Sequence, residues 1–456
     1  MQAVQVDGNN ILAVLETVEK LAAEMRENPK PVLLELMTFR MRGHEEASGT
    51  KYYPEGIQEK WETKDPVVNF EKFILQNNIC DEAQISAIKQ SIKQAINDAL
   101  DVAYAAPAIE PNTTKELGDL FMDYDGEIVA PAKESKSEMR FIDAISNGLR
   151  QSMEKHPNLV LMGQDIAEYG GVFKITEGFV EQFGKTRVRN TPLCESAIVG
   201  AGLGLSINGM KAMVEMQFAD FVTCGFNQIV NNLAKIHWRW GQNADVVVRM
   251  PTGAGVAAGP FHSQSNEAWF YHTPGLKILY PAFPSDAKGL LCAAFNDPNP
   301  VLFFEHKFLY RSLKEDVYDD YYTLPIGQAK VVKQGASISV ITYGMGVHWA
   351  LAYAEEHPDV DMEIVDLRSL APLDKDAIFS SVNKTGKAIV LQEDCLTGGI
   401  VGDIAAMINE NCFEQLDAPV LRVGALDTPV PFNASLEQNF LPQKRFAEAV
   451  NKLLKY

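Results

Sequence analysis

Cysteine is scarce in this sequence and is not grouped. Six cysteines are spread over 456 residues, and no two of them form a Cys-x-x-Cys pair. An iron–sulfur cluster, a structural zinc site and a disulfide framework are therefore all disfavoured. We expect the six side chains to behave as small, partly buried apolar residues.

Long apolar runs and basic residues are also in short supply. No apolar stretch reaches the roughly 20 residues that a membrane-spanning helix needs, and the first residues lack the basic and apolar segments of a signal peptide. A cytoplasmic protein without a membrane partner is expected. The net charge of −19 disfavours nucleic acid, whose phosphates would be repelled. It suits a soluble protein, or one attracted to a basic protein partner.

Apolar strand-like runs alternate with helical stretches from residue 137 onward. Continuous Val, Ile and Leu runs with helical crossovers are typical of mainly parallel sheets covered on both faces, so the predicted fold class is α/β. Residues 106–136, rich in Pro, Thr and acidic side chains, indicate a linker with a short helix. Helices are predicted at 10–26, 81–104, 346–356, 374–383 and 400–412, and strands at 31–36, 158–166, 212–218, 245–251, 277–282, 301–306, 337–343, 362–367, 388–394 and 420–425.

Glu195 is the first candidate for chemistry, in the motif TPLCESAIVGAGLGLSINGMKAMVEMQFADF. It lies where a loop enters a Gly- and Ala-rich apolar helix. A carboxyl group held against such a surface favours its neutral form, which suits a proton shared with a heterocyclic ring nitrogen. The same position also suits an acidic residue that stabilises a helix N-terminus by roughly 0.3–1 kcal/mol. Spacing alone favours the second interpretation.

Two loops carry further candidates. His262, in GPFHSQSNEAWFYHTPG, follows a glycine-rich loop that leaves a predicted strand. Such loops carry the chemistry of many α/β proteins, so this imidazole could act as an acid or base, or only as a hydrogen-bonding group of the loop. Arg40, Arg42 and His44 cluster in ELMTFRMRGHEEASGTKYYP. Guanidinium groups bind phosphate through two bonds, but a solvated basic loop is the simpler interpretation.

Taken in order, these segments resemble the thiamine-diphosphate-dependent dehydrogenase (decarboxylating) component of 2-oxoacid dehydrogenase complexes, in its fused alpha/beta form. MGQDIAEYGGVFKITEGF, FHSQSNEAWF and EDCLTGG are similar to the beta subunit, whereas QVDGNNILAVLE and RMRGHEEASGTKYY are similar to the last part of the alpha subunit. The resemblance implies a thiamine-diphosphate-binding fold, with a parallel sheet and helices on both faces, plus a transketolase-type C-terminal α/β domain. The expected parts are an incomplete alpha-type cofactor-binding domain (1–105), a linker (106–136), a beta-type pyrimidine-binding domain (137–315) and the C-terminal domain (316–456).

The resemblance also implies roles for single residues. Glu195 matches the glutamate that hydrogen-bonds the cofactor's aminopyrimidine and favours its imino tautomer, and Phe221 matches the aromatic residue that stacks on the pyrimidine. His262 matches a histidine near the substrate that is implicated in passing the acyl group to lipoyl. Arg40 and His44 match alpha-subunit residues that face the diphosphate and the reacting centre.

Metal binding is expected only in part. The family's alpha subunit uses a Gly-Asp-Gly motif and a later Asn to hold the magnesium of the diphosphate, and this sequence has no Gly-Asp-Gly. The alpha half therefore resembles one truncated at its N-terminus, with the magnesium ligands lying before Met1. We expect the chain alone to bind thiamine diphosphate poorly and to be inactive. Asp297 and Asn299 are similar to a potassium site of some relatives.

The resemblance implies decarboxylation of a 2-oxoacid with reductive acylation of the lipoyl group on the acyltransferase component. A branched-chain 2-oxoacid such as 2-oxoisovalerate is favoured over pyruvate, although one methylene in a pocket is worth only about 1–3 kcal/mol. A second copy of the chain is expected in a twofold assembly. Two alternatives remain open: transketolase-like ketol transfer, and a non-catalytic module that docks the acyltransferase, as the missing magnesium motif suggests.

Overall fold

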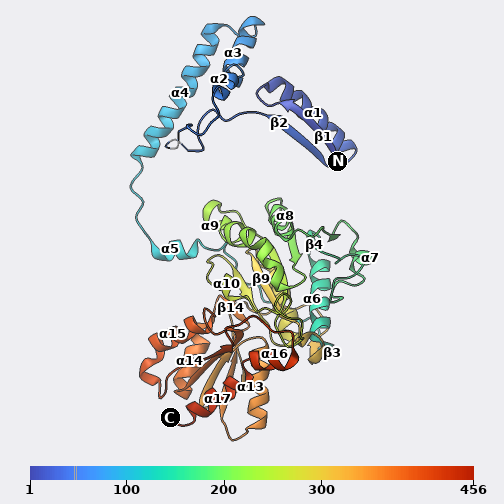
Figure 1. Cartoon of the computed structure of the whole chain (residues 1–456), viewed down its shortest axis with the longest axis vertical. Coiled ribbons are helices and arrows are strands. Elements are labelled where there is room, and N and C mark those ends of the chain that lie inside the picture. Colours follow the sequence, from blue (N-terminus) through green and yellow to red (C-terminus); the bar gives the residue numbers. More distant parts are fainter. Residues whose placement is uncertain (46, 48) are drawn as a thin grey trace. The chain divides into compact units, whose positions relative to one another are not determined.

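The computed structural model describes residues 1–45, 47 and 49–456. The chain divides into two compact units, Met1–Glu110 and Pro111–Tyr456, whose elements are labelled in Figure 1. Among the described helices, none combines the length and the apolar character that a membrane crossing requires.

The first unit is built on a strand–helix–strand arrangement. Strands β1 (Gln2–Asp7) and β2 (Val32–Met37) are parallel neighbours, and α1 (Ile11–Glu27) connects them. The Asn10 side chain accepts the Ala13 N–H and so begins α1. Strand β1 was not predicted, because its alternate residues are half-buried and it has no continuous apolar run. Three helices follow: α2 (Ile57–Glu62), α3 (Pro66–Gln76) and α4 (Glu82–Ala105).

Little of this first unit is buried. Of its described apolar side chains, only Leu21 and Ile85 are buried. Helix α4 carries exposed isoleucines at positions 88, 92 and 96, which lie on one face because residues four apart align along a helix. The unit therefore has only a small core of its own.

The second half of the predicted linker packs on later residues of the second unit. Helix α5 (Thr113–Gly118) lies in the linker, as the sequence predicts. The Asn299 side chain then binds both backbone groups of Met122, donating to the carbonyl at 3.0 Å and accepting the N–H at 2.8 Å. Further on, the Val129 N–H donates to Thr323 Oγ1 at 2.7 Å. Residues 122–129 are thus held in place by residues from later in the same unit.

The second unit begins with a seven-stranded sheet in the order β14-β8-β9-β7-β6-β4-β5. All neighbouring strands are parallel except β14, which comes from later in the chain and pairs antiparallel with β8. The strands are β4 (Leu159–Gly163), β5 (Val188–Asn190), β6 (Lys211–Glu215), β7 (Val246–Thr252), β8 (Lys277–Leu279), β9 (Val301–His306) and β14 (Ser369–Ala371).

Helices cover both faces of this sheet because alternate strand residues point to opposite sides. In β4, Leu159 and Leu161 pack with α6 and α11, whereas Val160 and Met162 pack with α8 and η2. The helices of this half are α6 (Phe141–Lys155), α7 (Phe179–Phe183), α8 (Glu195–Ile207), η1 (Ala219–Gly225), η2 (Gln228–Leu233), α9 (Ile236–Trp240), α10 (Ala268–Tyr271), α11 (Pro284–Asn296) and α12 (Leu309–Ser312).

A five-stranded sheet, in the order β11-β13-β12-β15-β16, forms the C-terminal half. Only β11, at one edge, is antiparallel to its neighbour. Helices α13 and α17 pack on one face and α14 and α15 on the other. The elements are β11 (Lys330–Lys333), β12 (Ile338–Thr342), α13 (Met345–Glu356), β13 (Met362–Asp366), α14 (Lys375–Thr385), β15 (Ala388–Cys395), α15 (Val401–Cys412), η3 (Phe413–Gln415), β16 (Leu421–Ala425), α16 (Ala434–Phe440) and α17 (Gln443–Leu453).

The long predicted strands are all present. The prediction 301–306 coincides with β9, and 388–394 ends one residue before β15 does. The other eight extend about one to three residues too far at one or both ends. After residue 130, the strands that were missing from the prediction are short or partly exposed. Among them, β3 (Lys136–Arg140) and β10 (Lys314–Tyr318) form an antiparallel pair. Mainly parallel sheets with helices on both faces confirm the predicted α/β class.

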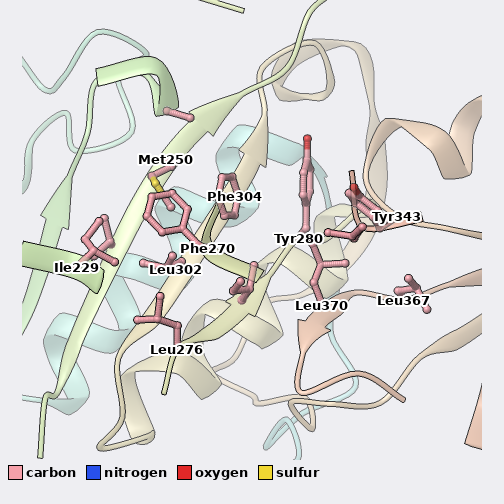
Figure 2. Packing of buried hydrophobic residues seen from close by; sticks show 14 of the residues in the cluster. Ile229, Met250, Phe270, Leu276, Tyr280, Leu302, Phe304, Tyr343, Leu367 and Leu370 are labelled. Atoms are coloured by element: carbon pink, nitrogen blue, oxygen red, sulfur yellow. The ribbon is translucent and has the colours of Figure 1, made fainter. Parts of the chain in front are cut away.

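The seven-stranded and the five-stranded sheet of the second unit share one apolar core. Figure 2 shows Phe304 of β9 and Tyr280, which follows β8, beside Leu370 of β14 and Tyr343, which follows β12 of the five-stranded sheet. The Tyr280 ring centroid lies 5.7 Å from that of Phe304 and 5.2 Å from that of Tyr343. The C-terminal half is therefore fixed against the carboxyl-terminal region of the first sheet, where the candidate site lies.

Candidate active site

Four neighbouring strands of the seven-stranded sheet end at one edge, and residues of the candidate site follow them there. Gln164 directly follows β4, Phe218 follows β6, Gly253 follows β7 and Lys307 follows β9. The carboxyl ends of parallel strands are where α/β proteins bind their ligands. Of the predicted candidates, Phe221 and His262 lie in the segments that follow β6 and β7. Glu195 begins the helix that follows β5, the edge strand next to β4.

Glu195 is the first residue of α8, and its side chain is buried, with 6% exposure. Gln164 Nε2 donates to its Oε1 at 3.1 Å. The helix packs against η1 so closely that a Cβ on Gly225 would lie 3.4 Å from the Glu195 carbonyl oxygen. The start of α8 thus lies against η1, the element that carries Phe221, and the carboxyl group itself is bound by an amide.

Phe221 and His262 are in contact. Their ring centroids are 5.5 Å apart, and the Phe218 centroid lies 4.9 Å from the imidazole. Both aromatic rings stand almost perpendicular to the imidazole, at 80° and 87°, an edge-to-face arrangement that aromatic groups prefer. Phe221 and His262 are only half-buried, so a ligand can reach this cluster.

Hydrogen bonds tie the His262 loop to η1. The backbone and side-chain N–H groups of Gln264 donate to Asp220 Oδ1 at 3.1 and 3.0 Å. Asn266 Nδ2 donates to the Ala219 carbonyl at 2.8 Å. These bonds fix His262 and Phe221 relative to each other, although they are far apart in sequence.

A buried ion-pair group lies in the strands just before this edge. Arg249 has no exposed surface. It donates to both carboxylate oxygens of Glu305, at 2.7 and 2.6 Å, and to Glu215 Oε2 at 2.6 Å. The three residues belong to β7, β9 and β6, so the group holds together the strands that carry the site. Removing one partner of such a group typically costs about 3–5 kcal/mol.

Lys307 is a polar residue of the site that the sequence analysis missed. Its ammonium donates to the Gly253 carbonyl at 2.7 Å and lies 5.7 Å from the Phe218 ring centroid. Burial lowers the pKa of Lys307 to about 8, although the charge of Asp220 opposes this shift. A signal was available, because Lys307 directly follows an apolar strand. Gln164 likewise directly follows an apolar strand, β4.

Arg40 and His44 lie in the first unit, in the loop after β2. Arg40 Nη2 donates to the His44 carbonyl at 2.8 Å, and the Tyr53 hydroxyl donates to the Arg40 carbonyl at 2.9 Å. Arg42, the third member of the predicted cluster, also takes part through its carbonyl, which accepts from the Tyr53 hydroxyl at 2.9 Å. This loop is therefore folded back on itself and carries its basic side chains on a defined backbone.

Asp297 and Asn299 make contacts that differ from those of a potassium site. Both are buried. The Lys277 ammonium pairs with one carboxylate oxygen of Asp297, and the other accepts the N–H groups of Asn299. The Asn299 amide oxygen accepts the Met122 N–H. These side-chain oxygens all have protein partners, and the potassium site stays a prediction.

Within residues 1–45, 47 and 49–456, no group of three or more His, Cys, Asp and Glu side chains is arranged to hold a metal ion. The six cysteines are unpaired; Cys292 and Cys412 are buried and Cys224 is exposed.

Comparison with family models and solved structures shows the class of protein to which the chain belongs. Residues 137–312 match the transketolase pyrimidine-binding domain, 327–445 match the transketolase C-terminal domain, and 1–112 match the dehydrogenase E1 component. Among solved structures, a split-gene transketolase described as an inactive beta4 tetramer shares the fold, with a TM-score of 0.56 and 21% identity over 70% of this chain and 98% of that chain. The chain is thus an α/β protein of the thiamine-diphosphate-dependent class.

Two relatives narrow this class. The 2-oxoisovalerate dehydrogenase subunit beta of Bacillus subtilis is 46% identical over 323 residues, which cover 70% of this chain and 99% of that protein. The pyruvate dehydrogenase E1 component subunit beta of the same organism is 41% identical over 325 residues, 70% of this chain and all of that protein. The chain belongs to the family of thiamine-diphosphate-dependent 2-oxoacid dehydrogenase components, and it has an alpha-type and a beta-type region.

Proposed function

We propose that the chain contributes the pyrimidine-binding half of a branched-chain 2-oxoacid dehydrogenase, which decarboxylates a substrate such as 2-oxoisovalerate and transfers the acyl group to a lipoyl group. The observation that carries this proposal is the placement of the buried Glu195 at the start of α8, which packs against η1, the element that bears Phe221 in contact with His262. Thiamine diphosphate, when bound, supplies the electron sink that decarboxylation of a 2-oxoacid requires.

Each residue has a task that its surroundings support. Glu195 is held by Gln164 with one oxygen engaged, so the carboxyl group is oriented and has a second oxygen to share a proton with a ring nitrogen of the cofactor. The accessible Phe221 ring offers a flat surface for stacking on the pyrimidine. His262 is accessible, and its imidazole can donate or accept a proton during acyl transfer.

A branched-chain substrate is favoured over pyruvate by the higher identity to the 2-oxoisovalerate relative, 46% against 41%. The expected acceptor is the lipoyl group of an acyltransferase component. We further propose that Arg40 and His44 serve the diphosphate end of the cofactor in a twofold assembly of two chains. Since the sequence has no Gly-Asp-Gly motif, we propose that the chain needs an additional alpha-type polypeptide for firm cofactor binding.

The test is a product assay with carboxyl-labelled substrates. The full chain is mixed with thiamine diphosphate, magnesium, ferricyanide as electron acceptor, and the alpha subunit of a 2-oxoisovalerate dehydrogenase. We expect release of labelled CO2 from 2-oxoisovalerate, faster than from pyruvate, and little release without the added subunit. Cofactor-dependent ketol transfer between sugar phosphates, without CO2 release from either 2-oxoacid, would contradict the proposal.

A further inference from the structure

The loop that leads from β7 to His262 is held by side chains rather than by secondary structure. At its start, Lys307 Nζ donates to the Gly253 carbonyl at 2.7 Å, and the Ala254 N–H donates to Glu393 Oε1 at 2.6 Å. Gly253 has a φ of +92°, and a Cβ there would lie 2.2 Å from His306 Nε2. The backbone at this point is therefore confined to one path.

The middle of the loop binds a carboxylate. The N–H groups of Gly255 and Ala257 both donate to the Glu437 carboxylate, each at 3.0 Å. The two residues have φ angles of +87° and +54°, and N–H groups turned inward in this way form a concavity that binds anions. Glu437 belongs to α16 of the C-terminal half and is buried, with 4% exposure. Its side chain is the anion that fills this concavity.

The same segment of the C-terminal half also covers the end of the loop. A Cβ on Gly259 would lie 2.3 Å from the Phe432 ring, so the ring packs directly on this backbone. The Gly259 carbonyl accepts the His262 N–H at 3.4 Å. Glu437 thus binds the middle of the loop, and Phe432 packs on its end, shortly before His262.

A cavity next to Glu437 allows this carboxylate to be replaced by a small ligand in an experiment. A cavity of about 390 Å³ lies beside the Glu437 carboxylate and is lined by Gly255, Ala257, Phe308 and Trp349, among others. If the side chain of Glu437 is shortened, a small carboxylate such as acetate can enter and occupy the place of the missing group.

We infer that Glu437 is a positioning residue: its carboxylate occupies an anion-binding concavity of the 253–259 loop and thereby fixes the loop that presents His262. The importance of His262 itself rests on the proposed function. The C-terminal half then sets the geometry of the site, as well as covering the first sheet.

The test measures amide hydrogen exchange in the full chain. In E437A we expect the amides of Gly255 and Ala257 to exchange at least about tenfold faster than in the original protein, because their acceptor is lost. The amides of β7 should keep their rates. E437Q, which keeps an oxygen acceptor but loses the charge, should be intermediate, and it covers the case in which E437A does not fold. Substitution of the exposed Glu410 on α15 by Ala is the matched control and should leave the loop unchanged.

Acetate separates positioning from a merely structural role. At constant ionic strength, acetate should restore slow exchange of the two amides in E437A, whereas chloride should not. The rate at which diethylpyrocarbonate modifies His262 should rise in E437A and fall again with acetate. Unchanged exchange in both variants, or equal recovery with chloride, would overturn the inference.

These measurements need neither cofactor nor turnover, so their outcome is independent of the proposed reaction. If the loop responds as described but no CO2 is released from any 2-oxoacid, the positioning role stands and only the proposed function fails.

Discussion

His262 can be tested separately from decarboxylation because the two half-reactions use different acceptors. The imidazole lies 5.5 Å from the Phe221 ring centroid and is accessible. We expect H262A to keep most of its CO2 release with ferricyanide but to lose acylation of lipoyl by about 10²-fold or more, the usual contribution of one acid or base. Lipoyl acylation followed by mass spectrometry, beside CO2 release, measures this. An equal loss in both assays would contradict the assignment.

Glu267 gives a prediction about pH. It is fully buried, and its Oε1 accepts the Tyr343 hydroxyl at 2.6 Å. Burial, with a smaller contribution from the charge of Asp394, raises the pKa of Glu267 from 4.5 to about 8. The folded chain therefore keeps a proton that the unfolded chain releases, and the stability from this group is present below pH 4.5 and is lost as pH rises toward 8.

The variant E267Q keeps a neutral acceptor at every pH. We expect it to become more stable relative to the original protein between pH 5 and pH 8, by roughly 3 kcal/mol. Urea unfolding at both pH values measures the difference. Parallel behaviour of the two proteins across this range would show that Glu267 does not titrate there.

At the scale of elements, helix α8 places Glu195 through close packing of its glycines. A Cβ on Gly202 would lie 2.9 Å from Val214 Cγ1, whereas a Cβ on Gly204 would have open space around it. We expect G202A to destabilise the second unit by about 1–3 kcal/mol through overpacking, and G204A to stabilise it by up to about 1 kcal/mol through helix propensity. Urea midpoints of the two variants provide the check, and equal effects would contradict the packing of α8 on β6.

The elements also show what the sequence could and could not predict. Strands such as β7 and β9 were recognised because both of their faces are buried, which leaves a continuous apolar run. The start of α8 at Glu195 was recognised from a loop followed by a Gly- and Ala-rich stretch. Strand β1 was missed because its burial alternates.

Contacts that cross the chain could not be predicted in the same way. Glu437 binds Gly255 over a separation of 182 residues, and Glu393 binds Ala254 over 139 residues. A glutamate in a C-terminal helix has no local feature that distinguishes it from a solvated acid. The contacts of Asp297 and Asn299 could not be predicted for a similar reason, because Lys277 and Met122 approach from other parts of the chain.

At the scale of the whole molecule, the two units should differ in stability. The first unit buries few of its apolar side chains, whereas α11 in the second is almost entirely buried. Local stability follows burial, so we expect amides of α1 and α4 to exchange about 100-fold faster than those of α11. Hydrogen exchange resolved by peptide tests this, and equal protection in the two units would contradict it.

We propose above all that the buried carboxyl group of Glu195 serves a thiamine-diphosphate-dependent decarboxylation. The most direct measurement compares labelled CO2 release from 2-oxoisovalerate by the original chain and by E195Q, each supplemented with the alpha subunit, thiamine diphosphate and magnesium. The glutamine keeps the shape and the bond to Gln164 but cannot share the proton, so release should fall by about 10²–10⁴-fold with an unchanged unfolding midpoint. Undiminished release by E195Q would contradict the account.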